Sequence, residues 1–189
     1  MNENLLSIVR FYFAQSVFTS ACQYYAVNRI ENRKKKFFYF TVGSSAITII
    51  LLSLQPFAIG DEAVIKLTSY FSSLLTAASL IFEVMNKEDL TLSICQHKTY
   101  GQKYKTLRDE FMALIEEVKS NNAEEHVLRG KKDLLLIRYS ELGNHAPSTT
   151  GKDYQNTQKA LGLGNNEDEQ FTWSDQEIDL FLPAKLRLL

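Results

Sequence analysis

Few residues in this chain have the types and spacing that catalysis or metal binding requires. Cys95 and His97 can form half of a zinc site, but no second pair supplies the other ligands, and His126 and His145 fall on separate predicted elements. Gly162-Leu163-Gly164 lacks the third glycine of a dinucleotide loop. The chain contains neither a phosphate loop ending in Gly-Lys-Ser/Thr nor a Gly-x-Ser-x-Gly elbow. We therefore predict no enzyme, no metal and no cofactor.

Side chains that can act together lie instead in two long apolar stretches. At about 100° per residue, one broad face of the second stretch carries Glu62, Lys66, Ser69, Ser72, Ser73, Thr76, Ser79 and Glu83. The first stretch has a shorter polar side formed by Thr41, Ser44, Ser45, Thr48 and Gln55. Each predicted helix in this part of the chain therefore has one polar face.

Two interpretations of these polar faces stay open. Small hydroxyl residues allow close helix contacts and hydrogen-bond across them or back to their own backbone. The same hydroxyls can instead line a water-filled path, with Glu62, Lys66 and Glu83 as charges at its two mouths. Two helices alone cannot enclose water, so a path requires several copies of the chain.

The two apolar stretches are long enough to cross a membrane. A hydrocarbon core of ~30 Å requires ~20 helical residues, and residues 37–59 meet that length without a charge. The second span, residues 64–84, reaches it only if Lys66 and Glu83 extend their charged heads to the interfaces. The short turn Gly60-Asp61-Glu62-Ala63 then forces antiparallel spans. Residues 37–84 are predicted to form a transmembrane helical hairpin.

Charge predicts the orientation of the hairpin. The run Arg33-Lys34-Lys35-Lys36 precedes the first span, reinforced by Arg29 and Arg10, whereas the turn carries Asp61 and Glu62. Basic flanks stay in the cytoplasm, so both termini are expected there. The start of the chain, Met1 to Asn4, is not basic, which argues against a cleaved signal peptide.

Nothing in the overall charge suggests bulk nucleic-acid binding, and no direct sequence-specific nucleic-acid binding is expected. The net charge is −1, and the basic residues cluster at the predicted membrane boundary rather than along a groove-reading face. Cys22 and Cys95 both fall on the predicted cytoplasmic side, where thiols stay reduced, so no disulfide is expected.

The remaining segments are predicted to be helical. Residues 1–36 form an amphipathic helix, either interfacial or buried in a bundle, with an apolar stripe of Leu6, Val9, Phe13, Val17, Ala21, Tyr24 and Val27. Residues 85–163 form a cytoplasmic helical region that continues unbroken from the second span. Its first helix has a heptad-like seam of Ile94, His97, Gly101, Tyr104, Arg108, Phe111, Ile115 and Val118, typical of a bundle helix or a coiled coil.

Two further helices and a tail complete the predicted organisation. The helix 124–142 is expected to turn Val127, Leu134, Leu135, Tyr139 and Leu142 inward, and a short helix follows at 152–161. Residues 164–189 are a linker and an amphipathic tail, whose short helix begins with a Ser174/Glu177 capping box and ends at Pro183. The tail either packs back onto the helices or binds a partner. The predicted class is an all-α membrane protein with an N-terminal amphipathic helix, a two-span hairpin and a cytoplasmic helical bundle.

The order of these parts resembles a known family. An aromatic helix ending in basic residues and a hairpin precede His97-x-x-x-Gly101-x-x-Tyr104-x-x-Leu107, and Ala146-Pro147 and Asp153-Tyr154 follow. This order resembles the SLATT domain, a two-transmembrane effector associated with nucleotide-producing and nucleotide-sensing modules in bacterial conflict systems. The resemblance covers about residues 3–163 and leaves out the tail.

The resemblance implies a pore-forming effector of an anti-phage, abortive-infection system. Homo-oligomers would depolarise the bacterial inner membrane when a nucleotide signal arrives, or when a partner nucleotide cyclase or reverse transcriptase system responds. We expect these homo-oligomers to hold four or more copies. His97, Gly101 and Tyr104 carry over as packing or transmission positions beneath the membrane. The alternative is a membrane-anchored scaffold that recruits a cytoplasmic partner through its helical region.

Overall fold

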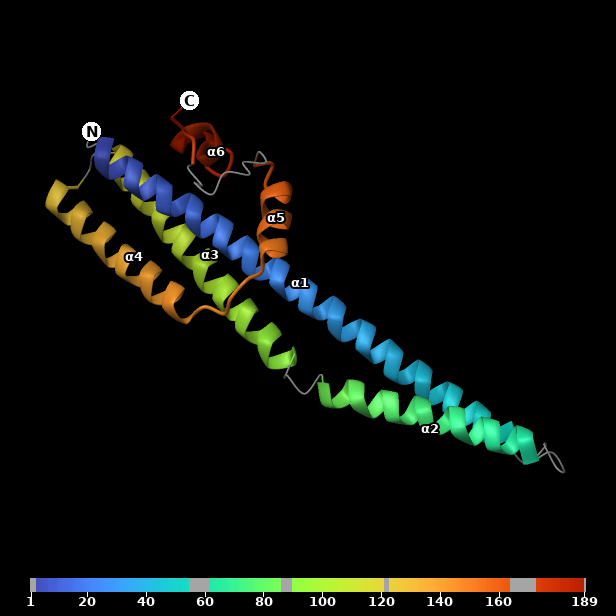
Figure 1. Cartoon of the computed structure of the whole chain (residues 1–189). Helices are drawn as coiled ribbons and strands as arrows, with labels where there is room; N and C mark the ends of the chain where they lie inside the picture. The colour runs from blue at the N-terminus through green and yellow to red at the C-terminus, as the bar shows by residue number, and fades with distance from the viewer. Residues whose placement is uncertain (1–2, 55–61, 86–89, 121–122, 164–172, 189) are drawn as a thin grey trace. The chain divides into compact units, whose positions relative to one another are not determined.

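The computed structural model describes residues 3–54, 62–85, 90–120, 123–163 and 173–188. Their regular elements are all helices, which confirms the all-α class (Figure 1). The helices are α1 (Glu3–Leu54), α2 (Glu62–Met85), α3 (Leu90–Ser120), α4 (Glu125–His145), α5 (Gly151–Ala160) and α6 (Asp175–Asp179), followed by a 3₁₀ turn, η2 (Ala184–Leu186).

The chain forms two compact units that share α1. The first unit comprises residues 1–28 and 93–189, and the second comprises residues 29–92. The predicted boundary between residues 36 and 37 lies inside the continuous helix α1, because no proline or glycine interrupts the sequence before Gly43. The predicted continuity from the second span into the next helix involves residues 86–89, which lie outside the described residues.

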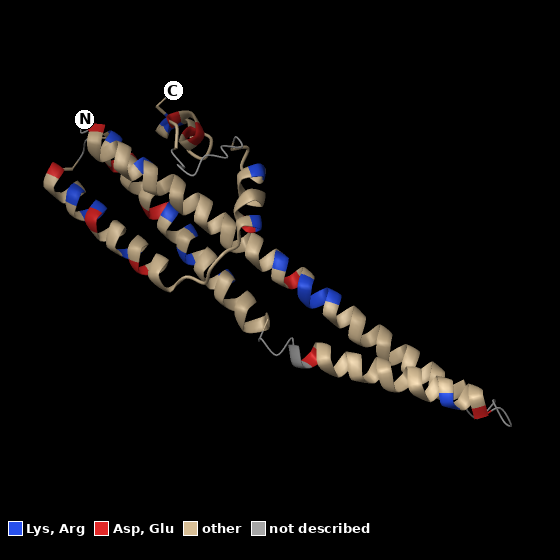
Figure 2. Ribbon diagram, viewed as in Figure 1, with Lys and Arg blue, Asp and Glu red and all other residues tan. Residues whose placement is uncertain are grey.

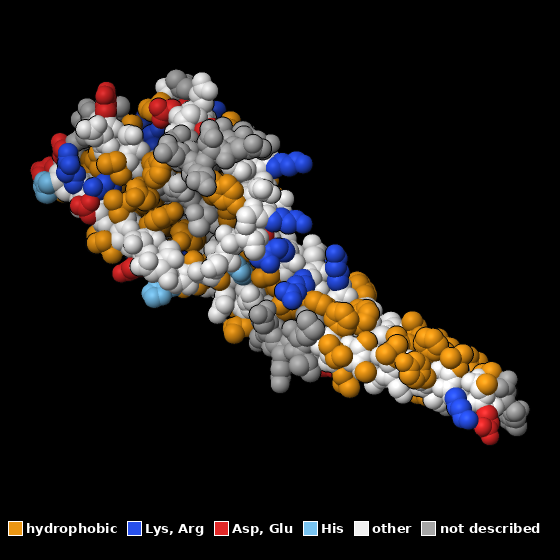
Figure 3. Space-filling view, in the orientation of Figure 1, with side chains coloured by type: hydrophobic (Ala, Val, Ile, Leu, Met, Phe, Trp, Pro, Cys, Tyr) orange, Lys and Arg blue, Asp and Glu red, His pale blue; other side chains and the backbone are white. Residues whose placement is uncertain are grey.

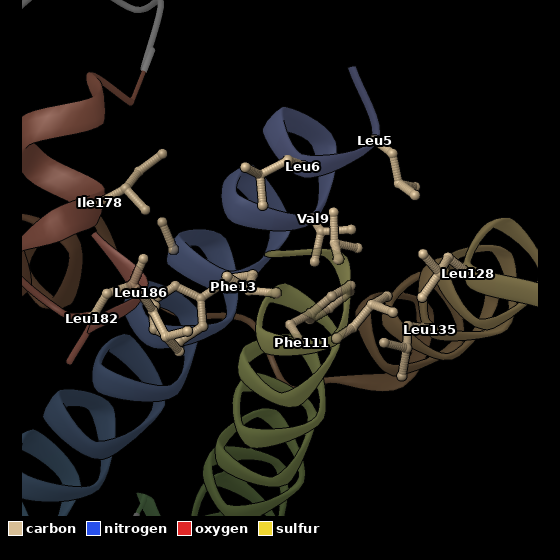
Figure 4. Close-up of a cluster of buried hydrophobic side chains, with 14 of the residues drawn as sticks. Leu5, Leu6, Val9, Phe13, Phe111, Leu128, Leu135, Ile178, Leu182 and Leu186 are labelled. Carbon is tan, nitrogen blue, oxygen red and sulfur yellow. The ribbon is translucent and has the colours of Figure 1, made fainter. Parts of the chain in front are cut away.

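The core of the first unit is built from α1, α3, α4 and the C-terminal segment (Figure 4). Val9 and Phe13 of α1 are fully buried against Phe111 of α3, and Leu128 and Leu135 of α4 complete that side. Burying one such side chain contributes roughly 1.5–3 kcal/mol. Side chains are buried around most of the circumference of α1 in the first unit. This part of α1 is therefore a bundle helix and not an interfacial one. Tyr24, predicted to face inward, is 37% exposed.

The predicted seam on α3 is largely confirmed. Six of its members are buried: His97, Gly101, Tyr104, Phe111, Ile115 and Val118. Leu107 and Leu114 are buried with them, while Ile94 and Arg108 lie half-buried at the edge. The helix ends at Ser120. Because these contacts are with α1 and α4 of the same chain, α3 is a bundle helix.

The inward face predicted for α4 is partly wrong. Leu128 and Leu135 are the buried pair, whereas Val127 is 41% and Leu134 is 64% exposed. Tyr139 and Leu142 do pack against the core, as predicted. The pairs Val127/Leu134 and Leu128/Leu135 have the same seven-residue spacing, so periodicity alone cannot choose between these two adjacent helix faces.

The short helices begin and end where their caps predict. Thr150 and Asp153 form a capping box at α5, and Ser174 and Glu177 form the predicted one at α6. Gly162, with φ of +68°, ends α5 in the left-handed conformation that glycine adopts without strain. The predicted linker beyond it falls mostly outside the described residues.

The C-terminal segment packs back onto the first unit. Ile178, Leu182 and Leu186 join the same apolar core as Leu6 and Phe13 (Figure 4). This confirms intramolecular packing of the tail over the alternative of a free peptide.

A buried ion pair fastens the tail to α1. The Arg10 side chain is fully buried, with Nη1 2.9 Å from Asp179 Oδ1 and Nη2 3.1 Å from Asp175 Oδ1. The Asp179 side chain is 8% exposed and that of Asp175 is 61% exposed. The interpretation of Arg10 as a reinforcement of the basic membrane flank was therefore wrong. A buried arginine requires anionic partners, and the tail supplies them.

The second unit is a hairpin formed by α1 beyond residue 28 and by α2. The two helices run side by side, with Phe40 and Phe82 ring centroids 4.5 Å apart (Figure 1). Both helices are long and apolar enough to cross a membrane. Their apolar side chains point outward, with Ile49 64% and Ile81 59% exposed, and Figure 3 shows this apolar surface in orange. Exposed apolar side chains at this density suit a lipid environment.

We predict that Asp179→Asn loosens the docked tail. The change leaves the buried guanidinium of Arg10 without its buried carboxylate, and breaking such a pair costs about 3–5 kcal/mol. The only tryptophan, Trp173, packs on Phe18 and Phe181, so its fluorescence in denaturant titrations reports tail docking.

The matched control is Asp175→Asn, which removes the exposed partner and should cost no more than about 1 kcal/mol. Equal destabilisation by the two variants would contradict the assignment of Asp179 as the main partner.

Candidate functional site

A groove of about 480 Å³ runs between α1 and α2 in the second unit. Its lining combines hydroxyl and small or apolar side chains: Thr48, Leu52, Ser69, Ser72, Ser73, Thr76, Ala77 and Leu80. Five of these positions belong to the predicted polar faces of the two spans. The hairpin therefore brings Thr48 of the first span together with four hydroxyl residues of the second.

Three of the groove hydroxyls donate their hydrogens to the helix backbone. Thr48 Oγ1 donates to the Ser44 carbonyl oxygen over 2.9 Å, and Ser73 Oγ donates to that of Ser69 over 2.9 Å. Thr76 Oγ1 donates to the carbonyl oxygen of Ser72 over 2.8 Å. Such bonds four residues back satisfy a serine or threonine donor without water. The oxygen lone pairs remain as acceptors on the groove surface.

Other predicted lining residues hold the hairpin together. Ser44 is buried, and its Oγ lies 2.7 Å from Ser79 Oγ on the facing helix. Ser72 is also buried, and its Oγ has no hydrogen-bond partner within the described ranges. Thr41 accepts a bond from Ser44 through its carbonyl oxygen, while Ser45 is exposed and does not line the groove.

The predicted mouth charges lie near the ends of α2. Lys66 Nζ is 3.0 Å from Glu62 Oε2, and both side chains are highly exposed. Glu83, near the C-terminal end of α2, is also exposed. None of these three residues lines the groove. The Glu62–Lys66 pair offsets its own charge, so the net charge of the turn sequence comes from Asp61.

A basic and aromatic band marks the other end of the apolar segment on α1. Arg33 to Lys36 are all exposed, and Figure 2 shows them as a blue band on the helix. The Arg33 guanidinium lies 5.4 Å from the centre of the Phe37 ring, and Lys34 Nζ donates to Thr91 Oγ1 over 2.8 Å. Basic residues followed by aromatic rings are typical of a membrane interface.

In the first unit, His97 belongs to a buried hydrogen-bond chain. His97 Nδ1 lies 2.6 Å from Gln23 Oε1, and Gln23 Nε2 donates to the Pro147 carbonyl oxygen over 3.2 Å. Because an amide oxygen only accepts, His97 Nδ1 carries the hydrogen. The chain connects α3, α1 and the segment after α4, so His97 fixes the packing of three elements.

Gly101 allows α1 and α3 to approach closely. A Cβ at this position would lie 3.1 Å from Tyr24 Cε2 and 3.4 Å from Gln23 Cβ. Ser20 Oγ donates to the Gly101 carbonyl oxygen over 2.9 Å, which further joins the two helices. Tyr104, one turn on, is buried beside Tyr139, and this burial raises its pKa to about 12. All three motif positions on α3 are packing positions.

The Asp153-Tyr154 pair positions α5. The Asp153 carboxylate accepts bonds from Thr150 N and Oγ1 and thereby caps its own helix, while the Tyr154 ring meets Phe18 at 4.8 Å. Burial raises the pKa of the nearby Cys22 thiol to about 11, so this cysteine stays protonated. Within the part of the chain that the structure describes, no cluster of three His, Cys, Asp or Glu can hold a metal.

Sequence reasoning missed several polar residues of this packing. Ser16, Ser20 and Gln23 are buried on α1, and Ser20 and Gln23 bond to other elements. Their spacing of four and three residues is itself a helical polar face within an apolar helix. That pattern could have indicated a buried hydrogen-bonding face before the structure was known.

The fold and the groove define a class: an all-α membrane protein with a two-span hairpin and a helical bundle. Residues 5–177 match the SMODS and SLOG-associating 2TM effector domain family 4, and the chain belongs to this family. The match extends into the tail beyond the predicted limit at residue 163 and includes Asp175, a partner of Arg10. Neither a curated protein nor a solved structure matches the chain.

We predict that Gly101→Val separates α1 from α3. The added side chain meets Tyr24 and Gln23 at close range, and such overpacking typically costs about 1–3 kcal/mol. Thermal unfolding of the detergent-purified protein, followed by circular dichroism, measures the loss.

Gly143→Ala is the control, because a Cβ there makes only an ordinary contact of 3.8 Å with the Tyr104 hydroxyl. Alanine in a helix should stabilise slightly. A Gly101→Val variant as stable as the wild type would rule out the close approach.

Proposed function

We propose that this effector forms homo-oligomers whose hairpins enclose a conducting path across the inner membrane. The observation that supports the proposal is the hydroxyl-lined groove on a hairpin whose other exposed side chains within the apolar segments are mostly hydrophobic. In a single hairpin the groove oxygens face hydrocarbon, which cannot hydrogen-bond to them. Four or more hairpins, with their grooves turned inward, would expose the same oxygens to water.

The groove chemistry suits a gated path rather than a permanently open one. The hydroxyl hydrogens of Thr48, Ser73 and Thr76 are already bonded to the helix backbone, so these three groups lose no hydrogen bond when a closed path holds no water. Leu52 and Leu80 lie among the lining hydroxyls, and apolar side chains at a constriction can exclude water. Opening then requires only a change in how the hairpins pack.

The proposed cellular role is depolarisation of the membrane during infection. The family is an effector family associated with defence systems, and membrane depolarisation stops growth. The signal is proposed to be a nucleotide, or a partner nucleotide cyclase or reverse transcriptase system, and its target is the helical bundle. The bundle connects to the hairpin through the continuous helix α1.

A second function stays open because one observation favours it. The bond between Ser44 and Ser79 and the backbone bonds of the groove hydroxyls satisfy many polar groups within one hairpin. Such a hairpin can sit in lipid alone and serve as the anchor of a scaffold. The bundle would then recruit a cytoplasmic partner without ion flux.

We predict that Ser73→Leu and Thr76→Leu abolish depolarisation without preventing assembly. Both side chains are exposed and line the groove, so leucine narrows and dewets a water-filled path. The measurements are the uptake of a potential-sensitive dye by expressing cells and mass photometry of the purified oligomer.

Ser53→Leu is the matched control. The Ser53 hydroxyl also bonds four residues back, to Ile49, but does not line the groove. Groove variants that assemble and still depolarise cells would contradict the pore-lining hypothesis. Loss of assembly would show that these residues pack between copies instead.

The proposed topology has its own prediction. Because the band from Arg33 to Lys36 precedes the first span, both termini should be cytoplasmic. An alkaline phosphatase domain fused after Leu189 should be inactive, and the same domain inserted after Asp61 should be active. The reverse pattern would overturn the topology.

A further inference from the structure

The basic band from Arg33 to Lys36 ends where the exposed apolar surface of the second unit begins. All four basic side chains are exposed, and the next exposed residues, Phe38 and Tyr39, are 63% and 69% exposed. Figure 3 shows basic side chains in blue beside the orange apolar surface of the hairpin. One helical turn rises only about 5.4 Å, so one lipid molecule can reach both kinds of side chain.

Lys35 lies on the outer face of α1, away from the second span. Phe37 and Phe40 mark the inner face, because their ring centroids lie 6.3 and 4.5 Å from that of Phe82 on α2. At about 100° per residue, Lys35 lies about 140–160° around the helix from these two rings. Its side chain is therefore on the side of the hairpin that faces the surroundings.

The lysines of the band differ in whether the chain already engages them. Lys34 Nζ donates to Thr91 Oγ1 over 2.8 Å. The exposed Lys35 and Lys36 have no side-chain ion pair or hydrogen bond within the described residues. Glu31, one turn before Lys35, is half-buried and has an interaction of its own. The ammonium groups of Lys35 and Lys36 are thus available to an external anion.

Tyr39 adds a hydroxyl donor to the same outer face. It lies four residues after Lys35 and about 40° around the helix. Helical side chains tilt toward the N-terminus, so the Tyr39 side chain is directed back to the level of Lys35. Phe38 and Val42 also lie within about 60° of Lys35, at 63% and 50% exposure. The outer face therefore presents polar donors first and apolar side chains next.

An anionic phospholipid matches this order of groups. The apolar stretch of α1 begins at residue 37, which places Lys35 and Lys36 at the headgroup level of a bilayer. Lysine near the membrane surface attracts anionic headgroups, and a tyrosine there has its ring in apolar surroundings and its hydroxyl among polar groups. Phe38 and Val42 can contact an acyl chain, whereas a soluble anion has no group that would cover them.

We propose that Lys35, Lys36 and Tyr39 bind the headgroup of an anionic phospholipid whose acyl chain lies along Phe38 and Val42. The phosphate accepts hydrogen bonds from the two ammonium groups and from the tyrosine hydroxyl. This site goes beyond the proposed ion path. It requires only that the hairpin crosses a membrane, which the length and composition of its helices and the two-transmembrane family support.

Native mass spectrometry of the detergent-purified protein measures this binding directly. The protein is titrated with phosphatidylglycerol or with phosphatidylcholine, which has the same phosphate but no net charge. We expect several-fold tighter binding of the first phosphatidylglycerol. Lys35→Gln should weaken that binding by about fivefold, the effect of one basic residue near an anionic surface, and Tyr39→Phe should weaken it as well. Equal affinity of the wild type for the two lipids would overturn the proposal.

The matched control is Lys34→Gln, which removes the same charge one residue away. Because the Lys34 ammonium is bonded to Thr91, its loss should leave the affinity for phosphatidylglycerol nearly unchanged. Equal weakening by Lys34→Gln and Lys35→Gln would mean general electrostatic attraction and would overturn the site. The side chains of Lys34, Lys35 and Tyr39 are exposed, so all three variants should keep the wild-type helix content in circular dichroism.

Two soluble competitors identify the source of the phosphate. Glycerol phosphate and a single-stranded oligonucleotide are each added to the phosphatidylglycerol complex. The lipid should remain bound, because neither competitor has an acyl chain to contact Phe38 and Val42. Displacement by glycerol phosphate would assign the lysines to soluble phosphates, and displacement by the oligonucleotide would assign them to nucleic acid; either result would overturn the lipid site. No ion flux enters these measurements, so their outcome is independent of the pore proposal.

Discussion

A hydroxyl group inside a bilayer has no water to bond, and the structure of the second unit follows from that constraint. Serine and threonine donors on both spans bond to carbonyl oxygens three or four residues back, and Ser44 bonds Ser79 across the hairpin. These bonds allow a polar face to lie within an apolar hairpin. They also leave acceptor oxygens along the groove that further copies of the chain can cover or that water can reach.

In the first unit, packing against other elements holds the N-terminal part of the long helix α1 in a bundle. The first part of α1 is buried around most of its circumference. Three of its buried polar residues have a partner from another element: Ser20 on α3, Gln23 on His97 and Pro147, and Arg10 on the tail. The helix α1 continues from the bundle into the hairpin without a break. His97 and Gly101 lie where α1 and α3 of the first unit pack together.

Much of this fold could be predicted from the sequence because its signals are local. Helix ends follow capping boxes, Gly162 and the ends of apolar runs, and two apolar segments of spanning length require a hairpin. The inward face of α4 was predicted correctly at Leu135, Tyr139 and Leu142 but not at Val127 and Leu134, because Val127/Leu134 and Leu128/Leu135 have the same seven-residue spacing. The role of Arg10 could not be predicted either, since its partner Asp175 is 165 residues away in the sequence. The predicted polar faces of the two spans contain most residues of the groove. Which hydroxyls face the other span and which face outward depends on helix packing, which the sequence pattern does not reveal.

Ion conduction by assembled hairpins can be measured directly. Purified wild-type protein, shown by mass photometry to be oligomeric, can be added to a planar lipid bilayer under an applied voltage. We expect discrete conductance steps that increase in number with the amount of protein inserted. A bilayer that stays silent although the oligomer has inserted would contradict the pore and leave this chain as a membrane-anchored scaffold.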